Sequence, residues 1–451
     1  MGSPTVDLPR VQRRTVAVLG SGTALSGLGV TIGITLGGLL ARDVAGSDAA
    51  SGLGQTAGVL GSAVLAVPLA RISDRSGRRA GLAAGFAVAV VGALVTVVAA
   101  ALASLSLLLV GLFAFGAATA CGLQARYAAA DLAAPERRGR DLSMVVWATT
   151  VGSVLGPNLA GPGADLGVRL GLPALGGGFA LSAVVFLLVA ALFVGLLRPD
   201  PLLLSRRLRG GGSAPEVRPR RATRLALAAV WADPGGRLGL TAVVVSHAVM
   251  VGVMVMTPVH MGHAHGPEGT TLRLIGLVIS VHVAGMYLFS PVVGWLADRL
   301  GRRVVVALAA GLLLAAAALS GTAGPADAGQ LGTGLFLLGL GWSCGLVAGS
   351  TLVTEAVGAQ QRPTAQGGTD LLMGLGAALA GVVGGPLLAL GGYGLVAAVS
   401  AALVLPLVVV LLRGSATGGS RSAVAQVAPE QPQRQEQADG DADLQHRVEG
   451  R

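Results

Sequence analysis

Long stretches without charged side chains dominate the chain. Ten such stretches contain no Asp, Glu, Lys or Arg: 15–41, 49–70, 80–125, 142–164, 170–197, 238–267, 274–297, 304–326, 328–354 and 371–412. A helix needs about 20 apolar residues to cross the ~30 Å hydrocarbon core of a bilayer. Eight of the ten stretches have the length of a single span, so each predicts one membrane-crossing segment.

The two longest stretches, 80–125 and 371–412, each have room for two spans. Ser104 and Ser106 interrupt the first, and the sequence Gly391-Gly392-Tyr393 interrupts the second. Because each is expected to turn once, the chain is predicted to have 12 spans. Hydrocarbon offers the backbone no hydrogen-bond partners, so the spans are expected to be helices. The predicted fold class is therefore an all-α integral membrane protein.

Composition agrees with this prediction. Of the 451 residues, 53% are hydrophobic and only 12% are charged, which is little for a soluble chain of this length. The 71 glycines allow helices to pack closely in lipid. There is no Lys, hence no Walker-type nucleotide motif, and His, Asp and Glu form no convergent cluster. We therefore expect no enzyme activity and no cofactor.

The arginines predict the orientation of the chain in the membrane. With the N-terminus in the cytoplasm, 29 of 32 arginines fall in cytoplasmic segments, leaving only Arg42, Arg169 and Arg273 outside. Positive residues favour the cytoplasmic side, so both termini are predicted to be cytoplasmic in a multi-pass protein of the inner (plasma) membrane. The net charge of +10 comes from these arginines, which are expected to bind the membrane surface rather than nucleic acid.

The spans divide six and six around a central segment. The predicted parts are a cytoplasmic N-terminus (1–14), a six-helix bundle (15–197), a cytoplasmic central loop (198–237), a second six-helix bundle (238–412) and a cytoplasmic tail (413–451). The tail is rich in polar residues and is expected to be disordered. Within the central loop, residues 225–232 are expected to form either an interfacial helix or a solvated linker.

A repeated motif relates the two bundles. Residues 70–79 and 294–303 both contain D-R-x-G-R-R, at an offset of 224 residues. The same offset carries Asp131, at the end of the fourth span, onto Glu355, at the end of the tenth. Two matches at one offset predict duplicated six-helix halves.

These paired loops resemble the cytoplasmic signature of the major facilitator superfamily, G-x-x-x-D-R-x-G-R-R. The 12 spans and the long central loop agree, and only Ala70 departs, from the leading Gly. The resemblance covers nearly the whole chain. It implies that two six-helix bundles transport a small molecule by alternating access, around a cavity lined by spans 1, 4, 7 and 10.

The repeated loops are also the candidate conformational latch. Gly77 and Gly301 permit tight turns between spans. The resemblance implies that Asp74 holds the N-terminal end of the eleventh helix, and Asp131 is expected to pair with Arg78 or Arg79. The alternative is that the loops only anchor the spans to lipid headgroups. The candidate latch residues are Asp74, Arg75, Gly77, Arg78, Arg79, Asp131, Gly294, Asp298, Arg299, Gly301, Arg302, Arg303 and Glu355.

The fifth span carries a second motif. Gly152, Gly156, Pro157 and Gly161 match G-x-x-x-G-P-x-x-[AG]-G, which resembles the antiporter signature of drug-exporting family members. The alternative is a close-packed, kinked helix with no bearing on direction. Drug exporters often carry an Arg within the fourth span, and Leu112 occupies that position here.

Few ionisable residues lie inside the spans, and each is a candidate for function because hydrocarbon penalises charge. His247 and His282 are candidates to bind the coupling proton, or are histidines hydrogen-bonded between helices. Arg126 and Trp342 are candidate substrate contacts. The cavity-lining spans contain no acid, which favours neutral, amphipathic or weakly anionic solutes.

A cluster of methionines and histidines ends the seventh span. His260, His263 and His265 are weak candidates for binding a soft or borderline metal, and a plain cavity wall or loop is the alternative. Taken together, the sequence predicts a monomeric secondary exporter that couples protons to efflux of a hydrophobic drug-like compound or metabolite. The alternatives are an importer of a small organic solute, a metal-ion exporter, or a membrane receptor or scaffold on a transporter fold.

Overall fold

The computed structural model of the protein describes residues 7–134, 137–208, 220–264, 268–358 and 361–413. In these ranges every regular element is a helix, as the all-α prediction requires. The tail predicted to be disordered lies outside them from residue 414, as does His265. The elements are α1 (Leu8–Ala45), η1 (Asp48–Ala50), α2 (Ser51–Ser76), α3 (Arg78–Ala101), α4 (Leu105–Phe115), α5 (Ala117–Ala130), α6 (Arg138–Leu155), η2 (Gly156–Leu159), α7 (Ala160–Arg169), α8 (Ala174–Leu196), α9 (Pro201–Leu208), α10 (Arg220–Ala232), α11 (Pro234–Met261), α12 (Glu268–Tyr287), α13 (Ser290–Leu300), α14 (Arg302–Thr322), α15 (Ala328–Glu355) and α16 (Arg362–Ala402).

Both predicted turns inside the long apolar stretches are present. In the first stretch α3 ends at Ala101 and α4 begins at Leu105, with the Ser104 hydroxyl accepting a hydrogen bond from the Leu107 amide. In the second, the helical segment from Thr364 to Arg413 is interrupted at Gly391 and Gly392. Eleven continuous segments of the described chain are long and apolar enough to span a membrane. The break divides the last of them, which gives the 12 predicted spans.

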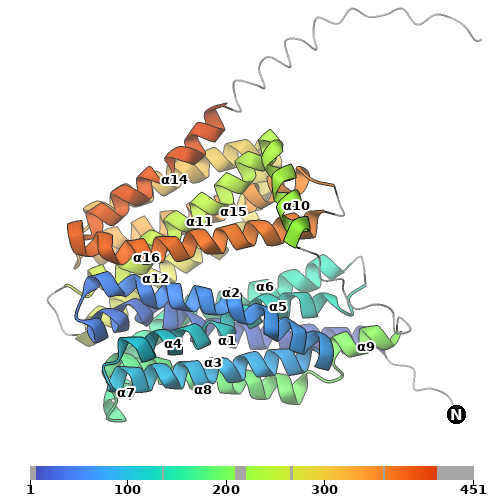
Figure 1. Ribbon diagram of the computed structural model, residues 1–451, viewed down its shortest axis with the longest axis horizontal. Coiled ribbons are helices and arrows are strands. Elements are labelled where there is room, and N and C mark those ends of the chain that lie inside the picture. The colour runs from blue at the N-terminus through green and yellow to red at the C-terminus, as the bar shows by residue number, and fades with distance from the viewer. Residues whose placement is uncertain (1–6, 135–136, 209–219, 265–267, 359–360, 414–451) are drawn as a thin grey trace, which may run out of the picture. The chain divides into compact units, whose positions relative to one another are not determined.

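The helices up to Leu411 belong to one compact unit. In the first half, α3 lies between α4 and α8, and in the second half α11 lies beside α15 and α16 (Figure 1). The end of the bundle at Gly77 and Gly301 is called here the arginine-rich end. The end at Asp48, Leu170 and His263 is called the opposite end.

A cluster of five phenylalanines fills the core of the first half. Neighbouring rings lie with centroids 5.1 to 5.9 Å apart, and four of the five are almost completely buried. Three glycines of α1 make room for three of these rings, because a Cβ at any of them would overlap a ring atom. The rings are Phe86, Phe115, Phe179, Phe186 and Phe193, and the glycines are Gly22, Gly29 and Gly33.

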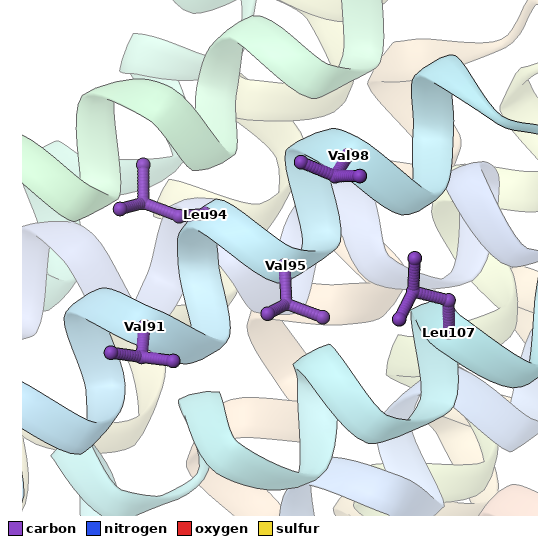
Figure 2. Close-up of a pocket in the computed structure, with 5 residues that line it drawn as sticks. All are labelled: Val91, Leu94, Val95, Val98 and Leu107. Carbon is purple, nitrogen blue, oxygen red and sulfur yellow. The ribbon is translucent and has the colours of Figure 1, made fainter.

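The outer surface of the first half has a purely apolar groove. Figure 2 shows its side chains on α3 and α4, and three of them are about half exposed. A groove without a polar lining suits lipid chains and offers nothing to orient a polar solute. The lining residues are Val91, Leu94, Val95, Val98 and Leu107.

The central segment contains two short helices. Its second helix, α10, buries Ala226 and Val230 against α11, α15 and α16, and leaves Leu225 63% exposed and Trp231 51% exposed. The structure therefore contains a helix over residues 225–232, rather than an irregular linker.

Candidate functional site

The two repeated loops have the same backbone geometry. Gly77 has φ of 93° and ψ of 164°, and Gly301 has φ of 90° and ψ of 149°. Side chains rarely adopt such positive φ, so glycine permits the chain to reverse between consecutive spans. The predicted tight turns are present in both halves.

Matching ion pairs accompany the two turns. The Arg78 Nε donates to Asp131 Oδ2 at 2.8 Å and the Arg78 Nη2 donates to Asp131 Oδ1 at 3.3 Å, forming the predicted contact. In the second half, Arg302 Nη2 lies 3.2 Å from Glu355 Oε1 and 3.4 Å from Asp298 Oδ1. Arg78 and Arg302 are related by the 224-residue offset, so the duplication extends to side-chain chemistry.

Asp74 has a different partner from the one that the family resemblance implies. Its carboxylate Oδ1 lies 3.7 Å from Arg206 Nη2 of α9, and its backbone carbonyl accepts a hydrogen bond from Arg206 Nη1. The structure does not bring Asp74 to the N-terminal end of α16. A latch role for Asp74 and Asp131 in another conformation stays a prediction.

The remaining latch candidates have separate surroundings. The Arg299 guanidinium lies over the Trp295 ring, 5.3 Å from its centroid, and Arg303 Nη2 donates to the Leu411 carbonyl at 2.7 Å. Arg75 is exposed, and Gly294 has open space where a Cβ would point. These positions are at the arginine-rich end, but the structure does not gather them into one cluster.

Sequence reasoning missed Asp200 at this end. Its Oδ2 accepts a hydrogen bond from the Arg79 amide at 2.8 Å, and its Oδ1 accepts from the amides of Leu202 and Leu203 at 3.0 and 3.1 Å. One carboxylate therefore caps the beginnings of both α3 and α9. The signal was available, because Asp followed by Pro at the start of a helix is typical of an N-cap.

At the opposite end the two halves are in direct contact. The Thr56 hydroxyl of α2 donates to the Ala378 carbonyl of α16 at 3.2 Å. Arg42 Nη1 donates to the Val259 carbonyl at 3.4 Å, and His263 Nε2 lies 3.1 Å from Asp48 Oδ2. These contacts join helices of the first half to helices of the second.

The antiporter-type motif lies in the same contact region. A Cβ at Gly152 would overlap the Ala24 carbonyl of α1, and a Cβ at Gly156 would overlap the Thr31 hydroxyl. Pro157 is the second residue of the turn η2 that interrupts the fifth span, and Gly161 packs on the Arg273 side chain of α12. The motif therefore packs between α1 of its own half and α12 of the other half.

Side-chain hydrogen bonds strengthen this junction. Asn158 Nδ2 donates to Ser280 Oγ at 2.6 Å, and Ser280 Oγ donates to the Val154 carbonyl at 2.7 Å. A Cβ at Gly276 of α12 would overlap the Pro157 carbonyl, so the backbones of η2 and α12 are in contact.

Toward the arginine-rich end, α16 loses its contact with α2. Gly381 and Gly385 pack against α2 and η1, whereas Gly374 and Gly367 have nothing within 4 Å of an added Cβ. The space between the halves therefore widens along α16 toward the arginine-rich end. Closure at one end and separation at the other is the arrangement of an alternating-access transporter in one of its two states.

Aromatic and polar side chains gather in the second half near this space. Trp342 Nε1 of α15 donates to His247 Nδ1 of α11 at 2.8 Å. The rings of Tyr287 and Trp342 meet edge to face, with centroids 5.6 Å apart. Arg126 of α5, from the first half, interacts electrostatically with Tyr287 and with Asp370 of α16. We call these five residues the central cluster.

Asp370 was not among the predicted site residues. It lies just outside the stretch 371–412 and belongs to the eleventh span, which was not expected to line the cavity. Helical spacing places Asp370 on the face of α16 toward α2. Which residues form that face becomes known only from the packing of the helix.

His282 lies apart from the central cluster. It is completely buried, its Nδ1 lies 2.8 Å from the Leu335 carbonyl, and its Nε2 has no hydrogen-bond partner. Because α12 packs on α15 at this point, His282 joins two helices of the same half.

The two metal candidates that the structure describes, His260 and His263, have different partners. His260 stacks on Tyr393 with ring centroids 4.5 Å apart, and its Nε2 lies 3.0 Å from the Ala323 carbonyl. His263 instead faces Asp48. Among the residues that the structure describes, no group of three or more His, Cys, Asp or Glu could hold a metal ion.

Known proteins share both the sequence and the fold. Residues 19–272 and 240–438 match the family described as Major Facilitator Superfamily. The Bacillus subtilis (strain 168) protein named "Uncharacterized MFS-type transporter YdeG" is 37% identical over 400 residues, covering 88% of this chain and 91% of the relative. The Brucella anthropi protein named "Riboflavin transporter RfnT" is 30% identical over 369 residues, covering 80% and 85%.

Solved structures agree with this at the level of fold. The nucleoside transporter NupG has a TM-score of 0.67 at 14% identity, covering 90% of this chain and 98% of that chain. A bacterial homolog of the human lysosomal transporter Spinster has a TM-score of 0.62 at 18% identity, covering 92% and 96%. The protein is a multi-pass membrane transporter, not an enzyme, and it belongs to the major facilitator superfamily.

Proposed function

We propose that this transporter is a secondary active exporter, which exchanges protons for a planar, amphipathic organic compound. The observation that carries the proposal is the central cluster, where Tyr287, Trp342 and His247 lie beside the arginine of the facing half. Aromatic side chains bind flat apolar surfaces, and a few polar groups orient the solute. Arg126 supplies several N–H donors in a fixed plane, which suits a carbonyl or carboxylate group.

A relative supports the planar class of substrate. The Brucella anthropi protein that is 30% identical is named a riboflavin transporter, and riboflavin has a flat heteroaromatic ring system with two carbonyl groups. Such a solute would stack on Trp342 and accept hydrogen bonds from Arg126. We assign the same chemical class of substrate to this chain, without naming the compound.

The direction of transport rests on one observation. The motif of Gly152, Gly156, Pro157 and Gly161 resembles the antiporter signature of exporters, and it packs at the junction between the halves. The space beside the central cluster widens toward the arginine-rich end, which the arginine distribution predicts to be cytoplasmic. Importers and exporters both open toward that side during their cycle, so this opening is compatible with export without indicating it. Protons are the proposed coupling ion because the chain lacks a nucleotide-binding motif of its own.

Transport into membrane vesicles tests the proposal. In inverted vesicles loaded with acid inside, the protein should accumulate riboflavin used as a fluorescent probe, and a protonophore should abolish accumulation. Trp342→Ala should raise KM about 2- to 13-fold, the effect of losing roughly 0.5–1.5 kcal/mol of stacking. Trp231→Ala, which removes an exposed tryptophan of α10, is the matched control and should leave KM unchanged.

The same experiment separates the alternatives. Accumulation only in right-side-out vesicles would replace the exporter with the importer. Absence of transport in both preparations would remove planar solutes as substrates. Transport of Zn²⁺ or Cu²⁺ in place of the probe would favour the metal exporter.

A further inference from the structure

A groove runs between α1 and α6, near the arginine-rich end of the first half. Its volume is about 430 Å³, which lies within the ~300–1,000 Å³ range of small-molecule sites. The two helices are in contact beneath it. A Cβ at Gly20 would lie 3.6 Å from the Ala148 Cβ, and the Thr23 hydroxyl donates to the Val145 carbonyl at 3.2 Å. The lining residues are Val16, Ala17 and Gly20 of α1, with Arg140, Met144, Trp147 and Ala148 of α6.

The wall that α6 contributes to this groove is apolar and exposed. Met144 and Trp147 are 49% and 66% exposed, and Val151 and Leu155 continue the stripe at 42% and 55%. Spacings of three and four residues place these side chains on one face of the helix. A large apolar surface is unfavourable in water but costs nothing against lipid chains. This face of α6 therefore points to the bilayer, and the groove opens beside it.

Two arginines flank the groove where it reaches the arginine-rich end. Arg140 of α6 lines the groove itself. Arg13 precedes Ala17 by four residues, which places it one turn before the groove on the same face of α1. The Gln12 side-chain amide donates to the Asp141 carboxylate at 2.6 Å, so the residues next to the two arginines are in contact. Arg13 and Arg140 therefore lie at the same level of the bundle.

Neither arginine has an acidic partner among the residues that the structure describes. Both residues are exposed, and no described carboxylate lies within 4.0 Å of either guanidinium group. The carboxylates near the starts of the two helices have other partners. Asp7 accepts a hydrogen bond from the Arg10 amide, and Asp141 accepts one from Gln12. Two positive charges at the end of an apolar groove are thus available to an anionic ligand.

The groove on α3 and α4 differs in this respect. Its lining is apolar and contains no charged residue. It lies toward the opposite end, where α3 ends at Ala101 and α4 begins at Leu105. Lipid chains suit both grooves, but of the two only the groove between α1 and α6 offers charges to a headgroup. The protein therefore contains its own comparison for a site that selects a lipid.

We propose that the groove between α1 and α6 is a binding site for one anionic phospholipid. The lipid phosphate accepts hydrogen bonds from Arg13 and Arg140, because guanidinium groups match the geometry of phosphate oxygens. One acyl chain lies along Val16 and Ala17 and contacts the Trp147 ring. The arginine distribution predicts that this end is cytoplasmic, and anionic lipids give the cytoplasmic leaflet its negative surface potential. The site is independent of the direction and the substrate of transport.

Quenching of Trp147 fluorescence by brominated lipids tests the site in the full chain. The other three tryptophans, Trp231, Trp295 and Trp342, are replaced by Phe, so that Trp147 is the reporter. The protein is reconstituted in phosphatidylcholine vesicles that contain either brominated phosphatidylglycerol or brominated phosphatidylcholine. The anionic lipid should quench Trp147 at a mole fraction about fivefold lower or less, the factor that corresponds to the attraction of a single arginine to an anionic surface.

Substitutions separate the contributions of charge and of groove shape. Arg13→Gln combined with Arg140→Gln should reduce the lipid preference to about twofold or less, because both charges are lost. Arg71→Gln is the matched control, since it removes an exposed arginine of α2 at the same end and should keep the full preference. Ala17→Phe leaves both arginines in place but puts a ring into the groove. It should reduce the preference about threefold or more, because the acyl chain loses its contacts.

A reporter in the second groove distinguishes a specific site from general enrichment of anionic lipid around the protein. With Trp147 also replaced by Phe, Leu94→Trp places the single tryptophan in the groove on α3 and α4. That reporter should show a preference of about twofold or less, because its groove has no charge. Three results would each overturn the proposal: equal quenching of Trp147 by the two lipids, the same preference at Leu94→Trp, or a preference that survives the loss of both arginines.

Discussion

Gly52 lies where α2 crosses α16, and its replacement by alanine tests the contact at the opposite end. An added Cβ would overlap the Gly381 carbonyl oxygen and lie 2.8 Å from the carbonyl carbon. Both are backbone atoms, so neither can rotate away, and relief requires the two helices to separate. Overpacking of this kind costs about 1–3 kcal/mol. The cost applies only while the opposite end is closed.

The substitution should therefore shift the balance between conformations. At about 2 kcal/mol the population of the closed opposite end would fall roughly 30-fold relative to the open one, since 1.4 kcal/mol is tenfold. Spin labels at Leu170→Cys and Ala326→Cys, both near the opposite end and on different halves, report the separation. The native Cys121 and Cys344 are buried. Distances between the labels should lengthen in Gly52→Ala.

Gly311→Ala is the matched control, because an added Cβ there has nothing within 4 Å. Its label distances should equal those of the parent protein. If Gly52→Ala gave the same distance distribution as Gly311→Ala, the contact between α2 and α16 would not hold the opposite end closed. Equal transport rates in the two variants would point the same way.

Three further predictions concern stability, each measured by thermal unfolding in detergent. Asp131→Asn should lower stability by about 1–3 kcal/mol, because it removes the charged partner of Arg78 in a part-buried pair, whereas Glu355→Gln should cost about 1 kcal/mol or less at a half-exposed pair; equal losses would contradict this reasoning. Gly392→Ala should lower the free energy of unfolding by about 1–3 kcal/mol, because φ of 67° with ψ of −172° strains any side chain. A yield of folded protein equal to that of Gly311→Ala would count against this prediction. Asp165→Asn should change the free energy of unfolding by less than about 1 kcal/mol, since Asp165 Oδ2 lies 3.7 Å from Arg273 Nη2 and both side chains are exposed. A larger loss would show that this pair holds the halves together.

The spans could be predicted because each obeys a local rule. Apolar length marks a membrane helix whatever its neighbours are, and Gly391-Gly392 marks a break because few other residues tolerate its geometry. The pairing of Arg78 with Asp131 was also accessible, since the repeat placed both at one end of the bundle. Such features depend on short segments and on symmetry.

The central cluster could not be predicted in the same way. His247 and Trp342 are 95 residues apart, and their hydrogen bond depends on how α11 packs on α15. Asp370 was overlooked because its place in the central cluster depends on how α16 is rotated about its axis, which the glycine contacts with α2 determine. For Asp74 the motif identified the residue but not its partner, which helix α9 supplies in this conformation.

The phenylalanine cluster makes the two halves mechanically unequal. Interlocked rings seated on the α1 glycines leave the first half few ways to deform without opening voids. The second half has no such cluster among its described residues, and its helices α11 and α16 meet through glycines and flexible methionines such as Met256. During a transport cycle the first half would therefore rotate as a rigid body, whereas the helices of the second half would bend.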